Sequence, residues 1–194
     1  MKEDYFLKKF FSQFQKVIYS SNQYYKDLIK VKKIFEVCKN NKKKIIIVGN
    51  GGSAAIASHV SVDLSKNAGI RSVNFNEADL ITCLSNDYSF DEWIVSALKL
   101  YCDREDILIL ISTSGSSQNH INAMKYANKN KIKTITFTGF VKNNPLKSLN
   151  KSGINFWVNS RAYNIVELSH LCLLLAIVDL CIGKTIYSAK RKIF

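Results

Sequence analysis

A short run of hydroxyl-bearing residues, the serine turn (residues 112–117), is the part of this sequence that points most directly to chemistry. It holds four serines and one threonine around Gly115. An apolar stretch typical of a buried strand precedes it, and a stretch with helical periodicity follows. The first N–H groups of a helix carry partial positive charge and bind anions, and hydroxyl groups add further donors. We therefore predict a site for a phosphate or another anion here; the alternative is that one of these residues only caps the helix.

A second candidate is the glycine turn (residues 49–53, Gly-Asn-Gly-Gly-Ser), which also follows an apolar, β-branched stretch. Glycine has no Cβ, so the backbone of such a turn can pass close to a ligand. The segment does not have the GxGxxG spacing of dinucleotide-binding proteins, and taken alone it is a weak signal. Two such turns on strands of one sheet would open onto the same crevice, which makes a shared ligand site the stronger interpretation.

Apolar periodicity predicts the elements that position these turns. The predicted strands are 44–48, 72–75, 107–111, 134–137 and 154–158, and the predicted helices are 54–64, 90–101, 119–128 and 165–181. Strands that alternate with helices at this spacing form a parallel sheet with right-handed crossovers and helices on both faces. The predicted fold is therefore α/β: a flavodoxin-like, doubly wound, five-stranded parallel sheet.

Residues 4–40 precede this unit and carry apolar side chains at helical spacing, which predicts one or two amphipathic helices. We expect two parts: an N-terminal helical extension over 1–40 that serves oligomerisation, and a single domain over 41–194. A monomer that folds the extension onto its own sheet is the alternative.

Composition excludes several classes of protein. The net charge is +13, but only four of the 28 basic residues are arginine and the lysines are scattered, so we predict a solvated surface and no nucleic-acid interface. The chain starts with charges mixed into its first apolar stretch and has no uninterrupted apolar run of about 18 residues, so we expect neither a signal peptide nor a membrane span. Five cysteines without CxxC spacing predict buried thiols in a reducing, cytoplasmic compartment.

Four segments together resemble a known family, the phosphoheptose isomerases, which are single-domain sugar isomerase (SIS) proteins. They are residues 49–53, 83–90, 111–117 and 135–139, and the resemblance extends over about residues 40–182. The family interconverts sedoheptulose 7-phosphate and a D-glycero-heptose 7-phosphate for the heptose of lipopolysaccharide or capsule. The resemblance implies a phosphorylated sugar as ligand, a homotetramer with active sites between subunits, and zinc as a possible cofactor.

The same resemblance assigns the ligand contacts residue by residue. It implies a substrate- and phosphate-binding set in which Thr113 and Asp87 contact the sugar; the full set is Asn50, Gly51, Ser53, Asp87, Ser112, Thr113, Ser114 and Ser117.

The catalytic positions match the family less well. Its His and general-base Glu, one helical turn apart after the glycine turn, correspond to His59 and Asp63, which also become the possible zinc ligands. Aspartate is shorter by one methylene, and a base displaced by about 1 Å can cost roughly a hundredfold in rate. Further along, the family's Gln and zinc-binding His correspond to Val166 and Leu174, and its Arg after the base is absent from 65–67.

The closing helix also carries His170, midway between these two lost groups on one helical stripe. It is a candidate second catalytic residue beside Asp63; the alternative is a core residue with one hydrogen bond. We expect His120, beyond the serine turn, to lie on a helix surface.

Two functions follow from this mixture of kept and changed positions. The first is a phosphoheptose isomerase-type aldose–ketose isomerase with altered acid/base residues. The second is a non-catalytic SIS protein, either a sugar-phosphate sensor or a scaffold for an acidic partner.

Overall fold

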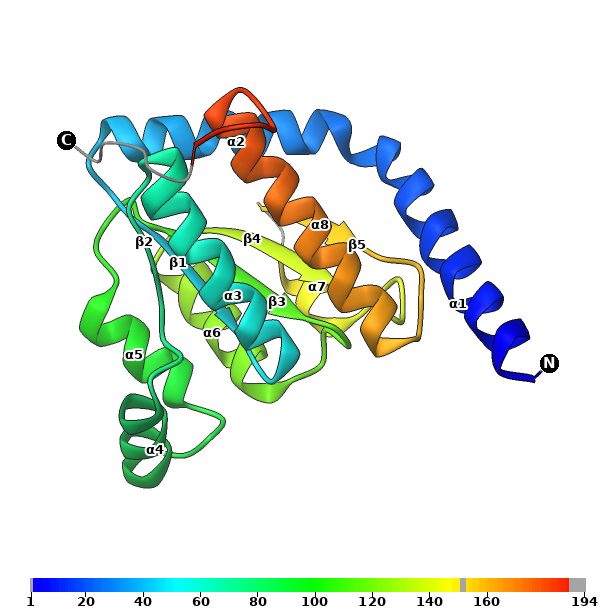
Figure 1. The fold of residues 1–194 in the computed structure, drawn as a ribbon. Helices are drawn as coiled ribbons and strands as arrows, with labels where there is room; N and C mark the ends of the chain where they lie inside the picture. Colours follow the sequence, from blue (N-terminus) through cyan, green and yellow to red (C-terminus); the bar gives the residue numbers. More distant parts are fainter. Residues whose placement is uncertain (1, 151–152, 189–194) are drawn as a thin grey trace.

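The structure is a computed structural model that describes residues 2–150 and 153–188, and its centre is a five-stranded, fully parallel sheet (Figure 1). The strand order is β2-β1-β3-β4-β5, which confirms the predicted flavodoxin-like winding. The strands are β1 (Ile45–Gly49), β2 (Ser72–Asn74), β3 (Ile107–Ser112), β4 (Lys133–Thr138) and β5 (Ile154–Trp157). The winding reverses between β1 and β3, the two strands that lead into the glycine turn and the serine turn.

The helices also lie close to where periodicity predicts them, with two additions. They are α1 (Lys2–Tyr19), α2 (Tyr25–Asn40), α3 (Gly52–Asp63), α4 (Ala78–Asp87), α5 (Trp93–Tyr101), α6 (Gln118–Lys129), α7 (Pro145–Leu149) and α8 (Tyr163–Ile182), with a 3-10 turn η1 (Ser20–Tyr24) and a π-helical turn η2 (Leu64–Ala68). The sequence did not predict α4 and α7, which are only ten and five residues long.

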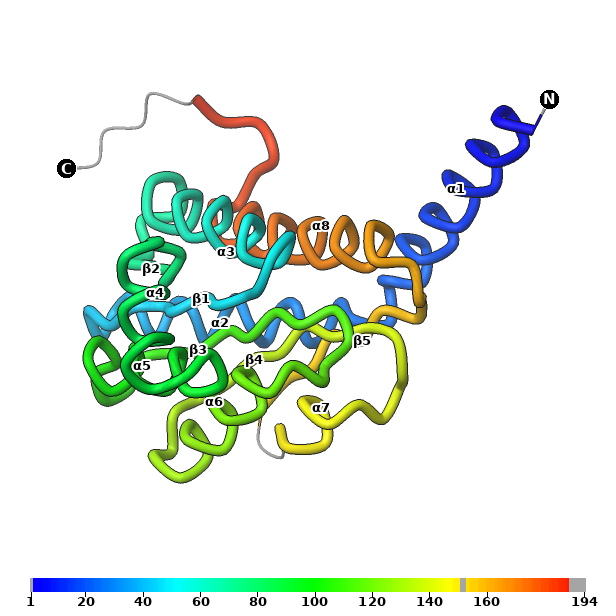
Figure 2. The backbone as a smooth tube through the Cα atoms, turned by 90° about the horizontal axis from the view of Figure 1, so that it is seen from below, coloured from blue at the N-terminus to red at the C-terminus, as the bar shows by residue number. Residues whose placement is uncertain are grey.

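Each central strand supplies side chains to two separate hydrophobic cores. In β1, Ile45 and Ile47 join the core under α2, α3 and α8, whereas Ile46 and Val48 join the core under α5, α6 and α7. Successive side chains of a strand point to opposite faces, so an unbroken apolar run serves both. Figure 2 shows α3 and α8 on one side of the sheet and α5, α6 and α7 on the other.

The N-terminal helices differ in how they pack. On α2, the residues Leu28, Val31, Phe35 and Cys38 are buried in the core shared with α8. Helix α1 has no buried residue and projects away from the sheet (Figures 1 and 2). The division at residue 40 stays a prediction, and this packing favours a boundary between α1 and α2.

Helix α8 is the one helix among the described residues whose length and composition would allow it to cross a membrane. The sequence predicted no membrane span because it has no long uninterrupted apolar run. Helix α8 nevertheless contains just two charged residues, Glu167 and Asp179. Its inward face, including Ile165, Leu173 and Ile177, covers the sheet. Burial of that face against the sheet accounts for much of the apolar character.

At the amino-terminal edge of the sheet, one buried carboxylate ties the starts of two strands together. Asp106 is 1% exposed and accepts hydrogen bonds from the backbone N–H groups of Lys44 (3.0 Å) and Asp103 (2.8 Å). The Lys44 ammonium lies 2.5 Å from Asp106 and 2.7 Å from the exposed Asp103. Asp106 therefore aligns the entries to β1 and β3 for the turns at their other ends.

We predict that Asp106→Ala lowers the free energy of unfolding by about 3 kcal/mol, since it leaves buried donors without their acceptor. Urea denaturation measures this. Asp103→Ala is the matched control, and loss of this exposed ion pair should cost much less. Equal effects of the two substitutions would contradict the prediction.

Candidate functional site

The serine turn leads into a helix whose N-cap residue makes no capping bond. Ser117 occupies the N-cap position of α6, but its hydroxyl accepts no N–H of the first turn. Within that turn, the His120 N–H donates to Asn119 Oδ1 (2.9 Å). The Ser117 Oγ lies 3.4 Å from that of Ser112, whose hydroxyl also accepts the Gly115 N–H at 3.2 Å. The simple capping interpretation therefore does not apply, and the turn keeps the N–H groups and hydroxyls that bind anions.

Neighbouring loops hold the serine turn in place. The Gly139 N–H at the end of β4 donates to the Thr113 carbonyl (2.9 Å), and the Leu146 N–H donates to that of Gly115 (2.9 Å). Gly115 has a φ of +66°, and a Cβ there would lie 2.1 Å from Oδ1 of Asn144, the N-cap of α7. A glycine is therefore required, and the turn is fixed before any ligand arrives.

In the glycine turn, different glycines are needed for different reasons. A Cβ on Gly49 would lie 2.4 Å from the carbonyl oxygen of Ser53, because the first turn of α3 packs directly on the end of β1. Gly51 has a φ of +55° and open space around it. A Cβ on Gly52 would collide with the Glu167 carboxylate of α8. Ser53 itself is 3% exposed, and its N–H donates to the Asn50 carbonyl.

A pair of amide side chains joins the two turns. Asn50 Nδ2 donates to Asn119 Oδ1 (3.2 Å), and Asn119 Nδ2 donates to Asn50 Oδ1 (3.3 Å). The register of β1 and β3 supports this pairing, because Gly49 lies opposite Ile111 and both turns begin at the same level. Sequence reasoning expected Asn50 in the site but missed Asn119, for which the only signal was its place just beyond the serine turn.

His120 lies beneath this amide pair, and the expectation that it lies on a helix surface was wrong. It is 1% exposed, and its Nδ1 lies 3.0 Å from Asn119 Oδ1. Desolvation lowers the pKa of His120 to about 4, although the nearby carbonyls of Val48 and Ile111 act in the opposite direction. Helix α6 turns this residue toward the sheet, so it is neutral near pH 7.

His170, the candidate second catalytic residue, is also in the core. Its exposure is 0%, its Nε2 lies 3.1 Å from the Thr138 carbonyl, and its buried Nδ1 has no hydrogen-bond partner among the described residues. The ring meets Phe137 edge to face. Burial lowers the pKa of His170 to about 4, opposed by the Thr138 contact. In a single chain this environment fits the core alternative, because a general acid or base must reach the substrate.

His59 and Asp63 lie at a distance from both turns. Helix α3 starts at Gly52 and runs back along the sheet, so Asp63 is about 16 Å further along its axis at 1.5 Å per residue. The Asp63 carboxylate lies 3.3 Å from His59 Nε2 and accepts a hydrogen bond from Asn67 (2.9 Å). One chain therefore does not bring the predicted base to the predicted phosphate site.

Asp87, the predicted sugar contact, ends helix α4 and is exposed. Its carboxylate accepts hydrogen bonds from Cys83 and Asn86 of the same helix. It lines a cavity with residues of α5, such as Ser96 and Lys99, and with none of the serine turn. Figure 1 shows α4 beside α5 at one side of the molecule.

The zinc that the resemblance implies does not fit the donors of this chain. Structural and catalytic zinc sites use at least three protein ligands. Among the described residues no group of three or more His, Cys, Asp or Glu side chains could hold a metal, and the pair His59–Asp63 offers two. The positions of the family's Gln and zinc-binding His hold the buried, apolar Val166 and Leu174. We derive no step through a metal.

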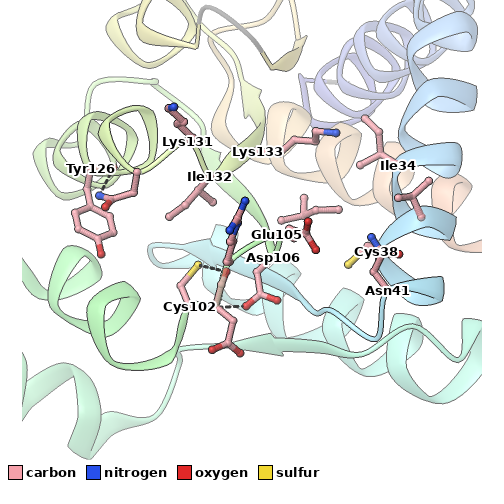
Figure 3. Close-up of a pocket in the computed structure, with 15 residues that line it drawn as sticks. Ile34, Cys38, Asn41, Cys102, Glu105, Asp106, Tyr126, Lys131, Ile132 and Lys133 are labelled. Carbon is pink, nitrogen blue, oxygen red and sulfur yellow. Dashed lines mark hydrogen bonds between the residues drawn. The ribbon is translucent and has the colours of Figure 1, made fainter.

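A cavity of about 690 Å³ lies at the opposite, amino-terminal edge of the sheet (Figure 3). Its walls include Cys38, Cys102 and Asp106, whose carboxylate is already fully engaged. Burial, reinforced by the negative charge of Asp106, raises the pKa of both thiols to about 11, so they are unreactive near pH 7. The cysteines are all free thiols, but the expectation of burial was wrong for Cys83 and Cys172, which are exposed.

Comparisons with known proteins agree with this geometry. The family model of the SIS domain matches residues 9–139. The chain belongs to the SIS domain family. Phosphoheptose isomerase of Buchnera aphidicola is 34% identical over 129 residues, a match that covers 64% of this chain and 65% of the relative's length.

Solved structures extend the likeness to almost the whole chain. The phosphoheptose isomerase of Neisseria gonorrhoeae superposes with a TM-score of 0.84 at 25% identity, covering 92% of this chain and 98% of that one. That of Francisella tularensis superposes with a TM-score of 0.85 at 24% identity, covering 95% and 100%. The fold of this SIS protein is therefore that of the phosphoheptose isomerases, α1 and α2 included.

The two buried histidines predict a loss of stability in mild acid. Both have folded-state pKa values of about 4 against about 6.5 when unfolded, so between these values the unfolded chain binds more protons. The contribution of the two neutral histidines to the free energy of unfolding is complete above pH 6.5 and is lost as the pH falls toward 4. We expect each to lower the free energy of unfolding by about 2 kcal/mol at pH 5 relative to pH 7.5.

Urea denaturation at the two pH values measures this loss, and His170→Leu removes one titrating group. The variant should show about half the pH-dependent loss that the histidines cause in the wild type. An unchanged pH dependence would show that His170 is not buried as described.

Proposed function

We propose that this SIS protein is a sugar-phosphate isomerase of the phosphoheptose type, which interconverts sedoheptulose 7-phosphate and a D-glycero-heptose 7-phosphate. The observation that carries the proposal is the junction of the serine turn and the glycine turn through the Asn50–Asn119 pair at the reversal of strand order. Ligands of doubly wound sheets bind at this place. The named relatives support this substrate class.

In the proposed complex the phosphate lies on the serine turn. Ser112, Ser114 and Ser117 donate from their hydroxyls, and the N–H groups at the start of α6 add partial positive charge. Thr113 and the glycine turn, with Asn50, Gly51 and Ser53, face the rest of the sugar. Because the phosphate is remote from the reacting carbons, its binding energy holds C1 and C2 in position for proton transfer.

The isomerisation requires a group that moves a proton between neighbouring carbons. A carboxylate takes a proton from C1 of the ketose, the electron pair forms the C1–C2 double bond of an enediol, and the proton returns at C2, while a hydroxyl proton passes from O1 to O2. We propose Asp63 of a second copy as this carboxylate, since Asp63 of the same chain is about 16 Å along α3 from the glycine turn.

This arrangement makes the working form a homo-oligomer with sites between subunits, for which the family's tetramer is the natural candidate. Helix α1 supports it, because none of its residues is buried against the described part of the chain, and Tyr5, Phe6 and Phe11 are all more than 60% exposed. We further propose a cytoplasmic role in supplying heptose for a surface polysaccharide.

A non-catalytic sugar-phosphate sensor is the second candidate. It is favoured by Val166 and Leu174, which are apolar where the family has a Gln and a His, and by the burial of His170. The binding turns would keep the ligand in that case, and no turnover would follow.

A coupled assay with sedoheptulose 7-phosphate, with and without zinc, tests the proposal. We expect turnover that does not depend on zinc and that falls at least about a hundredfold in Asp63→Asn, with the ligand-induced shift in melting temperature unchanged. A melting shift without turnover in the wild type favours the sensor. No shift at all rules out this ligand for both candidates.

The phosphate contacts predict a difference between two adjacent serines. Ser117→Ala removes a hydroxyl that faces Ser112, and we expect about tenfold weaker binding of sedoheptulose 7-phosphate in a thermal-shift titration. Ser116→Ala is the matched control, because its exposed hydroxyl bonds only to Ser114. Equal losses in the two variants would place the phosphate elsewhere.

A further inference from the structure

Glu167 is a carboxylate at the carboxyl edge of the sheet that the assignments above leave unused. It lies in the second turn of α8, and a Cβ built on Gly52 would come within 2.4 Å of its Oε2 and 2.7 Å of its Oε1. The carboxylate therefore rests against the backbone of the glycine turn. Helices α3 and α8 pack side by side, which brings these two residues together (Figure 2).

The Glu167 carboxylate has no hydrogen bond or ion pair with any residue that the structure describes. It is only partly exposed, and it borders a cavity of about 340 Å³. The other walls of this cavity are Phe10, Gly52, Ile56, Asn164, Leu168 and Leu171. An ionised carboxylate offers about four acceptor sites. The apolar side chains around it cannot donate to these sites, and the Asn164 amide, the polar side chain among them, makes no hydrogen bond to Glu167 in the described part of the chain. A ligand that enters the cavity meets a free acceptor.

This acceptor lies on the same edge as the phosphate turn. Gly52 is two residues from Asn50, whose amide pairs with Asn119, and Asn119 is two residues from Ser117. On the other side, Val166 packs against Gly139, which also touches the Thr113 carbonyl. The start of α8 thus reaches from the glycine turn to the serine turn.

We propose that Glu167 contacts the substrate: its carboxylate accepts hydrogen bonds from hydroxyl groups of the sugar whose phosphate lies on the serine turn. This inference rests on the proposed function for the ligand class, and it assigns a binding residue that the family resemblance did not supply. The open-chain sugar is rich in donors, and charge-assisted hydrogen bonds are the strong ones. Because the carboxylate repels phosphate, it favours a ligand whose hydroxyls and phosphate are well separated.

A purely structural role predicts a different behaviour. A carboxylate near the N-terminus of α3 stabilises the helix dipole, whichever ligand is present. In that case Glu167→Gln would lower the melting temperature and would affect all ligands alike.

The test compares two ligands, sedoheptulose 7-phosphate and inorganic phosphate, by calorimetric titration of the full chain. For Glu167→Gln we expect about ten- to a hundredfold weaker binding of the sugar phosphate, with inorganic phosphate within about twofold of the wild type. Glu105→Gln, at the opposite edge of the sheet, is the matched control and should change the affinity for neither ligand. Glu167→Asp keeps the charge but withdraws it by one methylene. Its affinity for the sugar phosphate should lie between those of the wild type and Glu167→Gln, and it replaces Glu167→Gln in the comparison if that variant is unstable.

Equal affinity of Glu167→Gln and wild type for the sugar phosphate overturns the proposal, as does an equal loss for both ligands. Turnover of the same preparations separates this inference from the proposed function. A wild type that binds the sugar phosphate selectively through Glu167 but does not turn it over supports the contact and contradicts the isomerase. A wild type that binds no sugar phosphate overturns both.

Discussion

The contact on which this molecule's candidate site depends is the direct packing of the first turn of α3 onto the end of β1. Gly49 has no room for a Cβ because the Ser53 carbonyl would lie 2.4 Å from it. This close approach brings the backbone of residues 50–52 to the level where β3 ends. The reciprocal amide pair of Asn50 and Asn119 can then bridge the two turns. Without it the glycine turn and the serine turn would be separate loops.

Binding and proton transfer have different structural origins in this protein. The parts that suit a phosphorylated sugar are assembled within one chain, where neighbouring loops fix them through Gly139, Asn144 and Leu146. The predicted acid/base groups are not: Asp63 lies at the far end of α3, and His170 is enclosed in the core. A fold can keep a rigid anion cradle while the residues around it change, because the cradle is mostly backbone.

The closing helix α8 shows how apolar substitution changes a site without changing the fold. Val166 fills the space against Gly139, and Leu174 lies in the core, so both positions remain well packed. The polar atoms that α8 presents to the carboxyl edge are reduced to those near its start, among them Asn164 and Glu167.

The sequence alone determined the fold class and predicted the place of the candidate site, because strand and helix periods and the glycine and serine turns are local properties. It predicted the five strands to within about two residues, and it identified residues 49–53 and 112–117 as one ligand edge. Only the tertiary structure decided which side chains meet. It placed His120 and His170 in the core, separated Asp63 from the turns, and brought Asn119 and Glu167 to them. Such contacts join residues distant in the chain, and their geometry follows from how α3, α6 and α8 pack on the sheet, which no local pattern encodes.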